Sequence, residues 1–156
     1  MGTRVGVVLP YRASNELVAF VESTLDLRAE LEFAGAQDGL DDDQLRELSE
    51  GVPPGSFAEI LEDGSTVYLT HELVAENLGK HARFLLEDGC DAVMICCTMD
   101  YPELDAIDRV ITPSTVLKHA ALVILPAGGT LGVVQPLEDG KEFEIQHWRA
   151  FCATHD

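Results

Sequence analysis

The sequence predicts an α/β fold in which helices alternate with the strands of a mainly parallel sheet. Unbroken apolar runs at residues 4–9 and 91–97 are typical of strands that are buried on both faces. Between such runs, apolar residues recur at helical spacing, as Leu17, Val21 and Leu25 do. Strands that alternate with helices pair in parallel through right-handed crossovers, so both patterns indicate the same fold class.

Each element follows from one of these two patterns and from the turn residues that bound it. The strand at 4–9 ends at Pro10, and a helix is expected over 14–28 with Ser14 or Asn15 as its N-cap. The sequence then predicts, in order, a strand at 31–36, a helix opened by the aspartates at 41–43, a hairpin at 57–61 and 66–70 that turns at Asp63-Gly64, a helix at 71–88, strands at 91–97 and 110–111, a helix at 113–125, a strand at 131–135 and a helix at 141–152. Together these elements predict a single flavodoxin-like lobe over 1–156, with helices on both faces of the sheet and one β-hairpin insertion.

The composition limits the partners and the location that we expect. The chain carries 28 acidic and 10 basic side chains, a formal net charge of −18, so its surface repels phosphate and neither nucleic acid nor a membrane is an expected partner. No apolar stretch reaches the ~20 residues that span a bilayer, and no secretion signal is recognisable, so a cytoplasmic location is expected. The four cysteines form no CxxC pair; we therefore expect reduced thiols and no metal site.

A short repeat suggests internal pseudo-symmetry. The segment GVVLP at residues 6–10 recurs as GVVQP at 132–136, and both copies are expected to be buried strands that end in proline. Chance is the alternative explanation, because GVV is common in parallel strands. If the repeat is genuine, residues 130–156 are the truncated start of a second lobe, and the chain is either a shortened protein or a fragment.

Three predicted loops meet at the carboxyl edge of the sheet, where open parallel sheets bind ligands. They are residues 10–14, 96–100 and 135–136. Because neighbouring strand residues face opposite sides, only one of Cys96 and Cys97 is expected in a cleft, and Cys97 is the last residue before the loop. Backbone N–H groups of the loop and of the following helix would favour its thiolate, whereas the Asp100 carboxylate would oppose it. A buried, inert thiol remains the alternative.

Several segments resemble AroM-like proteins. Residues 35–42, GAQDGLDD, are similar to the GALDGLDD signature of that family. The similarity continues through the Asp63-Gly64 hairpin, Cys97-Thr98 followed by YPEL at 101–104, the helix start at Pro113 and LGVVQP at 131–136. The resemblance extends over residues 4–150.

AroM-like proteins look like members of the aspartate/glutamate racemase superfamily, which is built from two pseudo-symmetric α/β lobes. The resemblance implies a cofactor-independent reaction in which one cysteine thiolate removes an α-proton and a cysteine of the other lobe returns a proton. It implies that Cys97 is the first-lobe cysteine, Thr98 its carboxylate-binding neighbour, and Ser14, with the backbone after Pro10, part of a carboxylate cradle. Arg12 is a further candidate, as a bidentate partner for an acidic substrate. The candidate substrate-binding residues are Thr98, Met99, Ser14, Arg12, Tyr11 and Gln135.

The sequence departs from the superfamily pattern in three places. Met99 follows Thr98 where a small residue is expected, which narrows the pocket. Residues 10–12 lack the GQxPR-like run, and no cysteine stands where the second lobe would supply one, since Cys152 lies on a predicted helix. Single-cysteine relatives in the superfamily carry out decarboxylation or cis–trans isomerisation, so the missing cysteine does not exclude all chemistry.

The sequence therefore predicts a cofactor-independent, isomerase- or racemase-like protein that acts on or binds a small carboxylate through Cys97. The alternative is a non-enzymatic protein that binds a small anion or a partner on the same scaffold, which Met99 and the missing lobe favour. Burial of Trp148 and Phe151 where a second lobe would sit predicts a homodimer, whose interface would bury on the order of 1,600 Å² in total.

Overall fold

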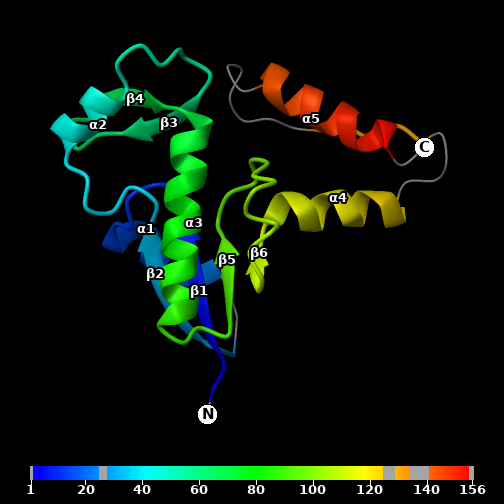
Figure 1. Cartoon of the computed structure of the whole chain (residues 1–156), viewed down its shortest axis with the longest axis horizontal. Coiled ribbons are helices and arrows are strands. Elements are labelled where there is room, and N and C mark those ends of the chain that lie inside the picture. Colours follow the sequence, from blue (N-terminus) through cyan, green and yellow to red (C-terminus); the bar gives the residue numbers. More distant parts are fainter. Residues whose placement is uncertain (1, 25–27, 125–128, 134–140, 155–156) are drawn as a thin grey trace.

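A parallel sheet forms the centre of the structure, a computed structural model that describes residues 2–24, 28–124, 129–133 and 141–154. The strands lie in the spatial order β2 (Glu30–Gly35), β1 (Arg4–Leu9), β5 (Ala92–Ile95) and β6 (Val110–Ile111) (Figure 1). Each neighbouring pair is parallel, so the carboxyl ends of the strands meet at one edge of the sheet. The predicted α/β class with a mainly parallel sheet is confirmed.

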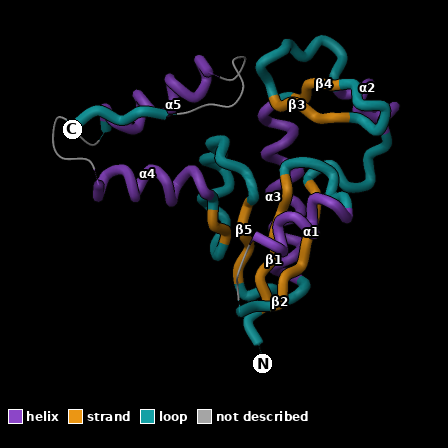
Figure 2. Tube along the Cα trace, turned by 180° about the vertical axis from the view of Figure 1, so that it is seen from behind, coloured by secondary structure: helices purple, strands orange, loops and turns teal. Residues whose placement is uncertain are grey.

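Two helices cover opposite faces of this sheet. α3 (His71–Glu87) packs on one face, and α1 (Asn15–Thr24) covers the other (Figures 1 and 2). The alternation of side chains along β1 explains this division, because Val8 belongs to the core on the α3 side, whereas Val7 and Leu9 belong to the core on the α1 side. The arrangement is that of a flavodoxin-like lobe, as the sequence predicts.

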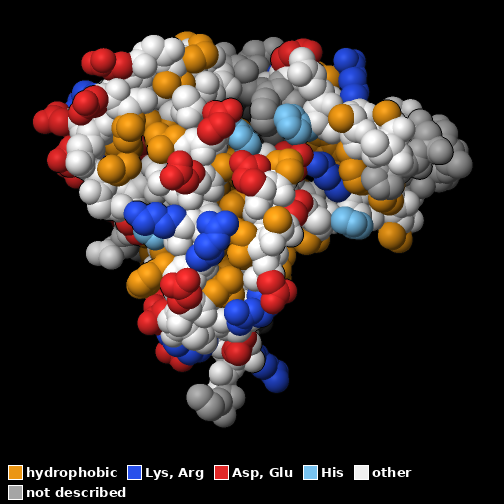
Figure 3. Space-filling model, in the orientation of Figure 1, with side chains coloured by type: hydrophobic (Ala, Val, Ile, Leu, Met, Phe, Trp, Pro, Cys, Tyr) orange, Lys and Arg blue, Asp and Glu red, His pale blue; other side chains and the backbone are white. Residues whose placement is uncertain are grey.

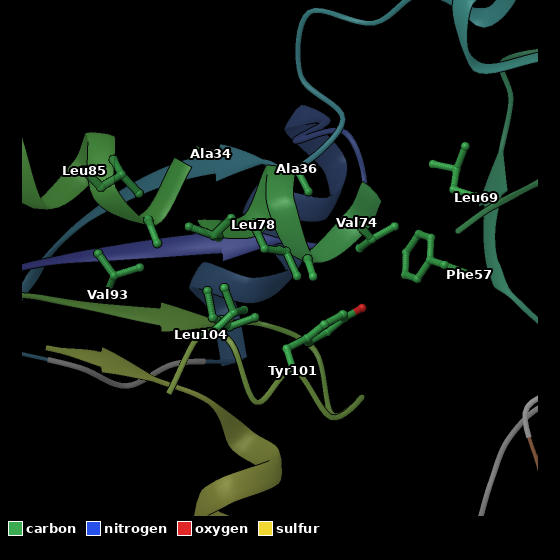
Figure 4. Packing of buried hydrophobic residues seen from close by; sticks show 14 of the residues in the cluster. Ala34, Ala36, Phe57, Leu69, Val74, Leu78, Leu85, Val93, Tyr101 and Leu104 are labelled. Atoms are coloured by element: carbon green, nitrogen blue, oxygen red, sulfur yellow. The ribbon is translucent and has the colours of Figure 1, made fainter. Parts of the chain in front are cut away.

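The close packing of α3 on the sheet requires a glycine in β1. A Cβ atom on Gly6 would lie 2.9 Å from side-chain atoms of both Leu85 and Val93, a distance shorter than Cβ atoms in proteins keep from their neighbours. The main core extends from this point across the sheet, α3, the hairpin and the segment after β5 (Figure 4). Its members include Ala34, Leu78, Phe57, Leu104 and Tyr101.

The predicted hairpin lies at the carboxyl edge of the sheet. It consists of β3 (Phe57–Ile60) and β4 (Thr66–Leu69), and α2 (Asp42–Leu48) lies beside it (Figure 1). Gly64 has a φ of 80° and supplies the left-handed conformation that the turn needs. Phe57 and its neighbours on the hairpin contact the main core, so the hairpin is anchored over the edge where β1 and β5 end.

The last two helices, α4 (Pro113–Ile124) and α5 (Lys141–Ala153), lie side by side and extend away from the sheet (Figures 1 and 2). They meet where the Lys118 ammonium lies 5.7 Å from the centre of the Phe151 ring. Trp148 packs edge-on against Phe151, with 6.1 Å between the ring centroids. Homodimerisation through these two aromatic residues stays a prediction. None of the described helices is long and apolar enough to cross a membrane.

One predicted strand is wrong over the part that the structure describes. Leu131, Gly132 and Val133 form no strand, and positions 134 and 135 lie outside the described residues. The edge strand β6 has only two residues, so it offers few backbone groups with which another strand could pair. The described residues of the second repeat copy, 132 and 133, are therefore not part of the sheet.

Candidate functional site

The candidate site lies where the central strands β1 and β5 end. The loop at 10–14 follows β1, and the loop at 96–100 follows β5. Because the two strands are direct neighbours, these loops leave the sheet side by side. Gln135, the remaining candidate, lies outside the described residues.

The loop at 10–14 is held by the end of β2. The Asp38 carboxylate accepts hydrogen bonds from the backbone N–H groups of Gly35, at 2.6 Å, and Ala13, at 2.8 Å. The buried Gln37 side chain reaches the carbonyl oxygen of Pro10 at 3.5 Å. The GAQDGLDD segment thus fixes the backbone of this loop, which is a structural reason for its composition.

Ser14 performs the capping role that the sequence predicts. Its Oγ accepts a hydrogen bond from the backbone N–H of Leu17 at 3.2 Å, at the start of α1. The hydroxyl therefore already has a partner within the chain. Its predicted contact with a substrate carboxylate stays a prediction.

Arg12 is surrounded by carboxylates of the hairpin and of α2. Its guanidinium lies 2.9 Å from Asp42, 3.8 Å from the buried Glu59 and 3.9 Å from Glu62. A cavity of about 710 Å³ opens beside this cluster. The residues that line the cavity include Tyr11, Arg12, Glu16, Leu17, Glu59 and Glu62.

Glu59 is the most perturbed carboxyl group near the site. Burial raises its pKa to about 7, although the charge of Arg12 and a hydrogen bond from the Arg12 backbone oppose the rise. Its Oε2 atom is buried and has no hydrogen-bond partner among the described residues. The charge on the Arg12 cluster therefore changes near neutral pH.

Cys97 and Cys96 face opposite sides of the sheet, as the alternation of strand residues predicts. Both follow Ile95, the last residue of β5. Cys97 packs against the core on the α3 side, and Cys96 packs on the α1 side. Burial raises the pKa of the Cys96 thiol, which favours its protonated, unreactive form.

Two tyrosines lie close to Cys97. The Tyr101 hydroxyl is 3.9 Å from the Cys97 sulfur and 3.8 Å from the Met99 sulfur. Burial is the larger cause, and the charge of Cys97 the second, that raises the pKa of Tyr101 above its ordinary value. The same two causes raise the pKa of Tyr11. Both phenols therefore remain protonated, so they can donate hydrogen bonds near the thiol.

Asp100 does not present an unpaired charge to this site. Its carboxylate forms an ion pair of 2.6 Å with Lys118 of α4, and both side chains are largely buried. The Asp100 carbonyl oxygen lies 2.8 Å from Nε2 of His71, the first residue of α3. The His71 ring stacks on Tyr101 with 4.5 Å between the centroids. Lys118 thus offsets the negative charge of the Asp100 carboxylate, which on the sequence alone would oppose a Cys97 thiolate.

Tyr101, His71 and Lys118 belong to the site but are not among the residues that the sequence predicts for it. Tyr101 has one available signal, since it follows Cys97 by four residues within the YPEL segment. His71 and Lys118 come from distant helices, and only the fold brings them together. The first helix after Cys97 is α4, which begins at Pro113 beyond the turns at 102–106, so only loop N–H groups lie next to the thiol along the chain.

The described residues contain no group of three or more His, Cys, Asp or Glu side chains that could hold a metal ion. The three carboxyl groups around Arg12 form ion pairs with its guanidinium instead. Around Cys97, this edge carries a thiol, the phenols of Tyr11 and Tyr101 and the imidazole of His71, and the Arg12 cluster adds a guanidinium and the Glu59 carboxyl group.

Comparisons with known proteins identify a family. The model of the family described as AroM protein matches residues 3–154. Neither the curated proteins nor the solved structures gave a match. The matched range includes all four strands of the parallel sheet, the GAQDGLDD segment and the Cys97-Thr98 pair. Because the match covers nearly the whole chain, the chain belongs to the AroM family.

Proposed function

We propose that this AroM-family protein is a cofactor-independent, isomerase- or racemase-like protein that acts on a small carboxylate, with Cys97 as base or nucleophile. The observation that carries the proposal is the position of Cys97. Its sulfur lies just beyond the carboxyl end of a central parallel strand, where a protonated Tyr101 hydroxyl is 3.9 Å away. This edge is where open α/β sheets bind their ligands.

The proposed chemistry assigns roles to Cys97, Thr98 and Lys118. The Cys97 thiolate removes a weakly acidic proton from the carbon next to the carboxylate, or attacks the substrate directly. Thr98, which follows it, binds the substrate carboxylate, as in the superfamily that the sequence resembles. Lys118 offsets the charge of Asp100, so a thiolate meets less repulsion than the sequence alone indicates.

A second candidate function is binding without turnover. The observation that favours it is the cavity beside Arg12, whose lining includes Tyr11 and Glu59 but not Cys97. An anion or partner group in this cavity would contact Arg12 without meeting the sulfur. Met99 packs against the core next to the thiol and so takes up space that a small residue would leave for a substrate.

Alkylation of the thiols tests the first function. We expect iodoacetamide to modify Cys97 much faster than Cys96 or Cys90, because burial raises the pKa of both other thiols. Peptide mapping by mass spectrometry gives the rate at each cysteine. A small dicarboxylate such as malonate is expected to slow only the reaction at Cys97. Equal, slow modification of all three thiols would contradict the proposal.

Two serine variants separate catalysis from binding. Dicarboxylates and hydantoin-like compounds are screened for a rise in melting temperature, and each hit is assayed for turnover. In the enzyme, Cys97→Ser abolishes turnover, whereas Cys96→Ser, the matched control, retains it. Stabilisation of the wild type and of Cys97→Ser without turnover in either protein supports the binding function instead.

A further inference from the structure

We propose that Tyr101 is a positioning residue whose hydroxyl donates a hydrogen bond to the Cys97 sulfur when that sulfur is a thiolate. The inference rests on the proposed function, because it assigns a partner to the thiolate that the function requires. It adds a residue to the site that lies outside the Cys97-Thr98-Met99 segment and that contacts no substrate itself.

The Tyr101 hydroxyl is buried next to the Cys97 sulfur. Tyr101 is 1% exposed and lies in the main core beside Leu104 and Leu78. Its ring follows the core toward the hairpin, so the hydroxyl is at the end where Phe57 lies (Figure 4). There it is 3.9 Å from the Cys97 sulfur, within the range of hydrogen bonds to sulfur.

Ionisation of Cys97 decides which acceptor the Tyr101 hydroxyl uses. The hydroxyl has two sulfur atoms within reach, since the Met99 thioether lies at 3.8 Å. A thioether is a weak acceptor, and so is a neutral thiol, whereas a thiolate carries a full charge and accepts strongly. Ionisation of Cys97 therefore directs the Tyr101 proton toward the Cys97 sulfur and away from Met99.

A chain of contacts holds the Tyr101 ring in one orientation. His71 stacks on Tyr101 at 4.5 Å, and His71 is held by the Asp100 carbonyl at 2.8 Å. Asp100 is held in turn by Lys118 at 2.6 Å. These contacts join α3, α4 and the loop after β5 around one aromatic ring. The donor is thus in place before the thiol ionises, which reduces the cost of reorganisation.

The variant Tyr101→Phe tests the inference because it removes only the hydroxyl. The rate of Cys97 modification by iodoacetamide is measured in the whole protein from about pH 6 to about pH 10, by mass spectrometry. We expect the midpoint of the pH–rate profile to rise by about one pH unit, so that Cys97 reacts about tenfold more slowly at neutral pH. The limiting rate to which each profile extrapolates at high pH, which belongs to the ionised thiol, is expected to be the same in both proteins. A purely structural role would not shift the midpoint in this way.

Three comparisons make the outcome decisive. Tyr68→Phe on β4 removes a hydroxyl from a partly exposed tyrosine and is expected to keep the wild-type profile, as is the reaction of Cys152 in every variant. Met99→Leu removes the competing acceptor and is expected to lower the midpoint, because the Tyr101 hydroxyl then donates to the Cys97 sulfur alone; this variant tests the inference if Tyr101→Phe does not fold. A Tyr101→Phe profile that coincides with the wild-type profile, or an unchanged or raised midpoint in Met99→Leu, overturns the inference while fast modification of Cys97 still supports the proposed function. Slow modification of Cys97 in the wild type overturns both.

Discussion

Among the carboxyl groups that the structure describes, Glu59 is the one whose negative charge is most strongly disfavoured by burial. The residue is 2% exposed, and its folded-state pKa of about 7 lies well above the ordinary value of 4.5. Between these two pH values the folded chain holds a proton that the unfolded chain has lost, so stability falls as the pH rises through this window. Above neutral pH the full cost applies, which is about 3 kcal/mol for a shift of this size.

Replacement of this carboxyl by an amide removes the cost. We expect Glu59→Gln to be more stable than the wild type at pH 8, and its advantage to grow by about 2 kcal/mol between pH 5 and pH 8. Urea denaturation at the two pH values measures the difference. Glu62→Gln, the control, alters a side chain that is 86% exposed and is expected to change little. A Glu59→Gln variant less stable than the wild type at pH 8 would mean that the ion pair with Arg12 outweighs desolvation.

Gly35 sets the distance between β2 and the loop at 10–14. A Cβ atom there would lie 2.5 Å from the Tyr11 carbonyl oxygen and from Asp38 Oδ1, and closer still to the Ala13 nitrogen. We expect Gly35→Ala to lower the free energy of unfolding by about 1–3 kcal/mol, since backbone atoms must move. Gly132→Ala, where a Cβ atom meets nothing within 4 Å, is the control in the same denaturation experiment. Equal free energies of unfolding for the two variants would show that the loop at 10–14 can move away from a Cβ atom on residue 35 without loss of stability.

At the scale of elements, α2 depends on its first residues. Asp41 is the N-cap, and it exchanges hydrogen bonds with Gln44 in a capping box. We expect Asp41→Ala to cost about 1 kcal/mol of unfolding free energy, as the loss of an N-cap usually does. Asp43→Ala, the matched control, removes a side chain that is 98% exposed and forms a 3.7 Å contact with Arg46. Its expected cost is much smaller, and comparable losses in thermal unfolding would contradict the capping assignment.

Some helices and strands could be predicted from the sequence, and others could not. β1 and α3 were predictable, because each buries a regular pattern of apolar residues that depends only on local periodicity. The hairpin was predictable from Asp63-Gly64, since few residues other than glycine fit the turn. The absence of a strand at 131–133 was not predictable, because pairing depends on the strand edge that the fold offers, here the two-residue β6, and not on the segment itself.

The candidate site, too, could be predicted only in part. Cys97 could be found from its place at the end of an apolar run. Its surroundings could not, because His71 and Lys118 reach it only through the packing of α3 and α4. Likewise, Arg12 is surrounded by carboxylates from α2 and the hairpin, and no local pattern encodes a contact between residues so far apart in sequence.

At the scale of the whole molecule, the net charge of −18 opposes folding. Acidic side chains are spread over the face shown in Figure 3 and do not form a single patch, so the repulsion acts between many exposed groups. Dissolved salt screens such groups, whereas it screens buried pairs much less. The general repulsion and the local cost at Glu59 therefore respond differently to salt.

We expect the melting temperature at pH 8 to rise by about 3 °C, or ~1 kcal/mol, when NaCl is raised from about 0.05 M to about 0.5 M. Glu59→Gln is expected to show the same rise, because its buried carboxylate contributes little to the screened repulsion. Near the sequence pI of about 4.4 the net charge approaches zero, so the salt effect is expected to vanish there. Differential scanning calorimetry measures the melting temperature of the wild type at pH 8, of Glu59→Gln at pH 8 and of the wild type near the pI, each at both salt concentrations. A rise that persists near the pI would point to a general salt effect, and a rise that is lost in Glu59→Gln would place the repulsion at the Arg12 cluster.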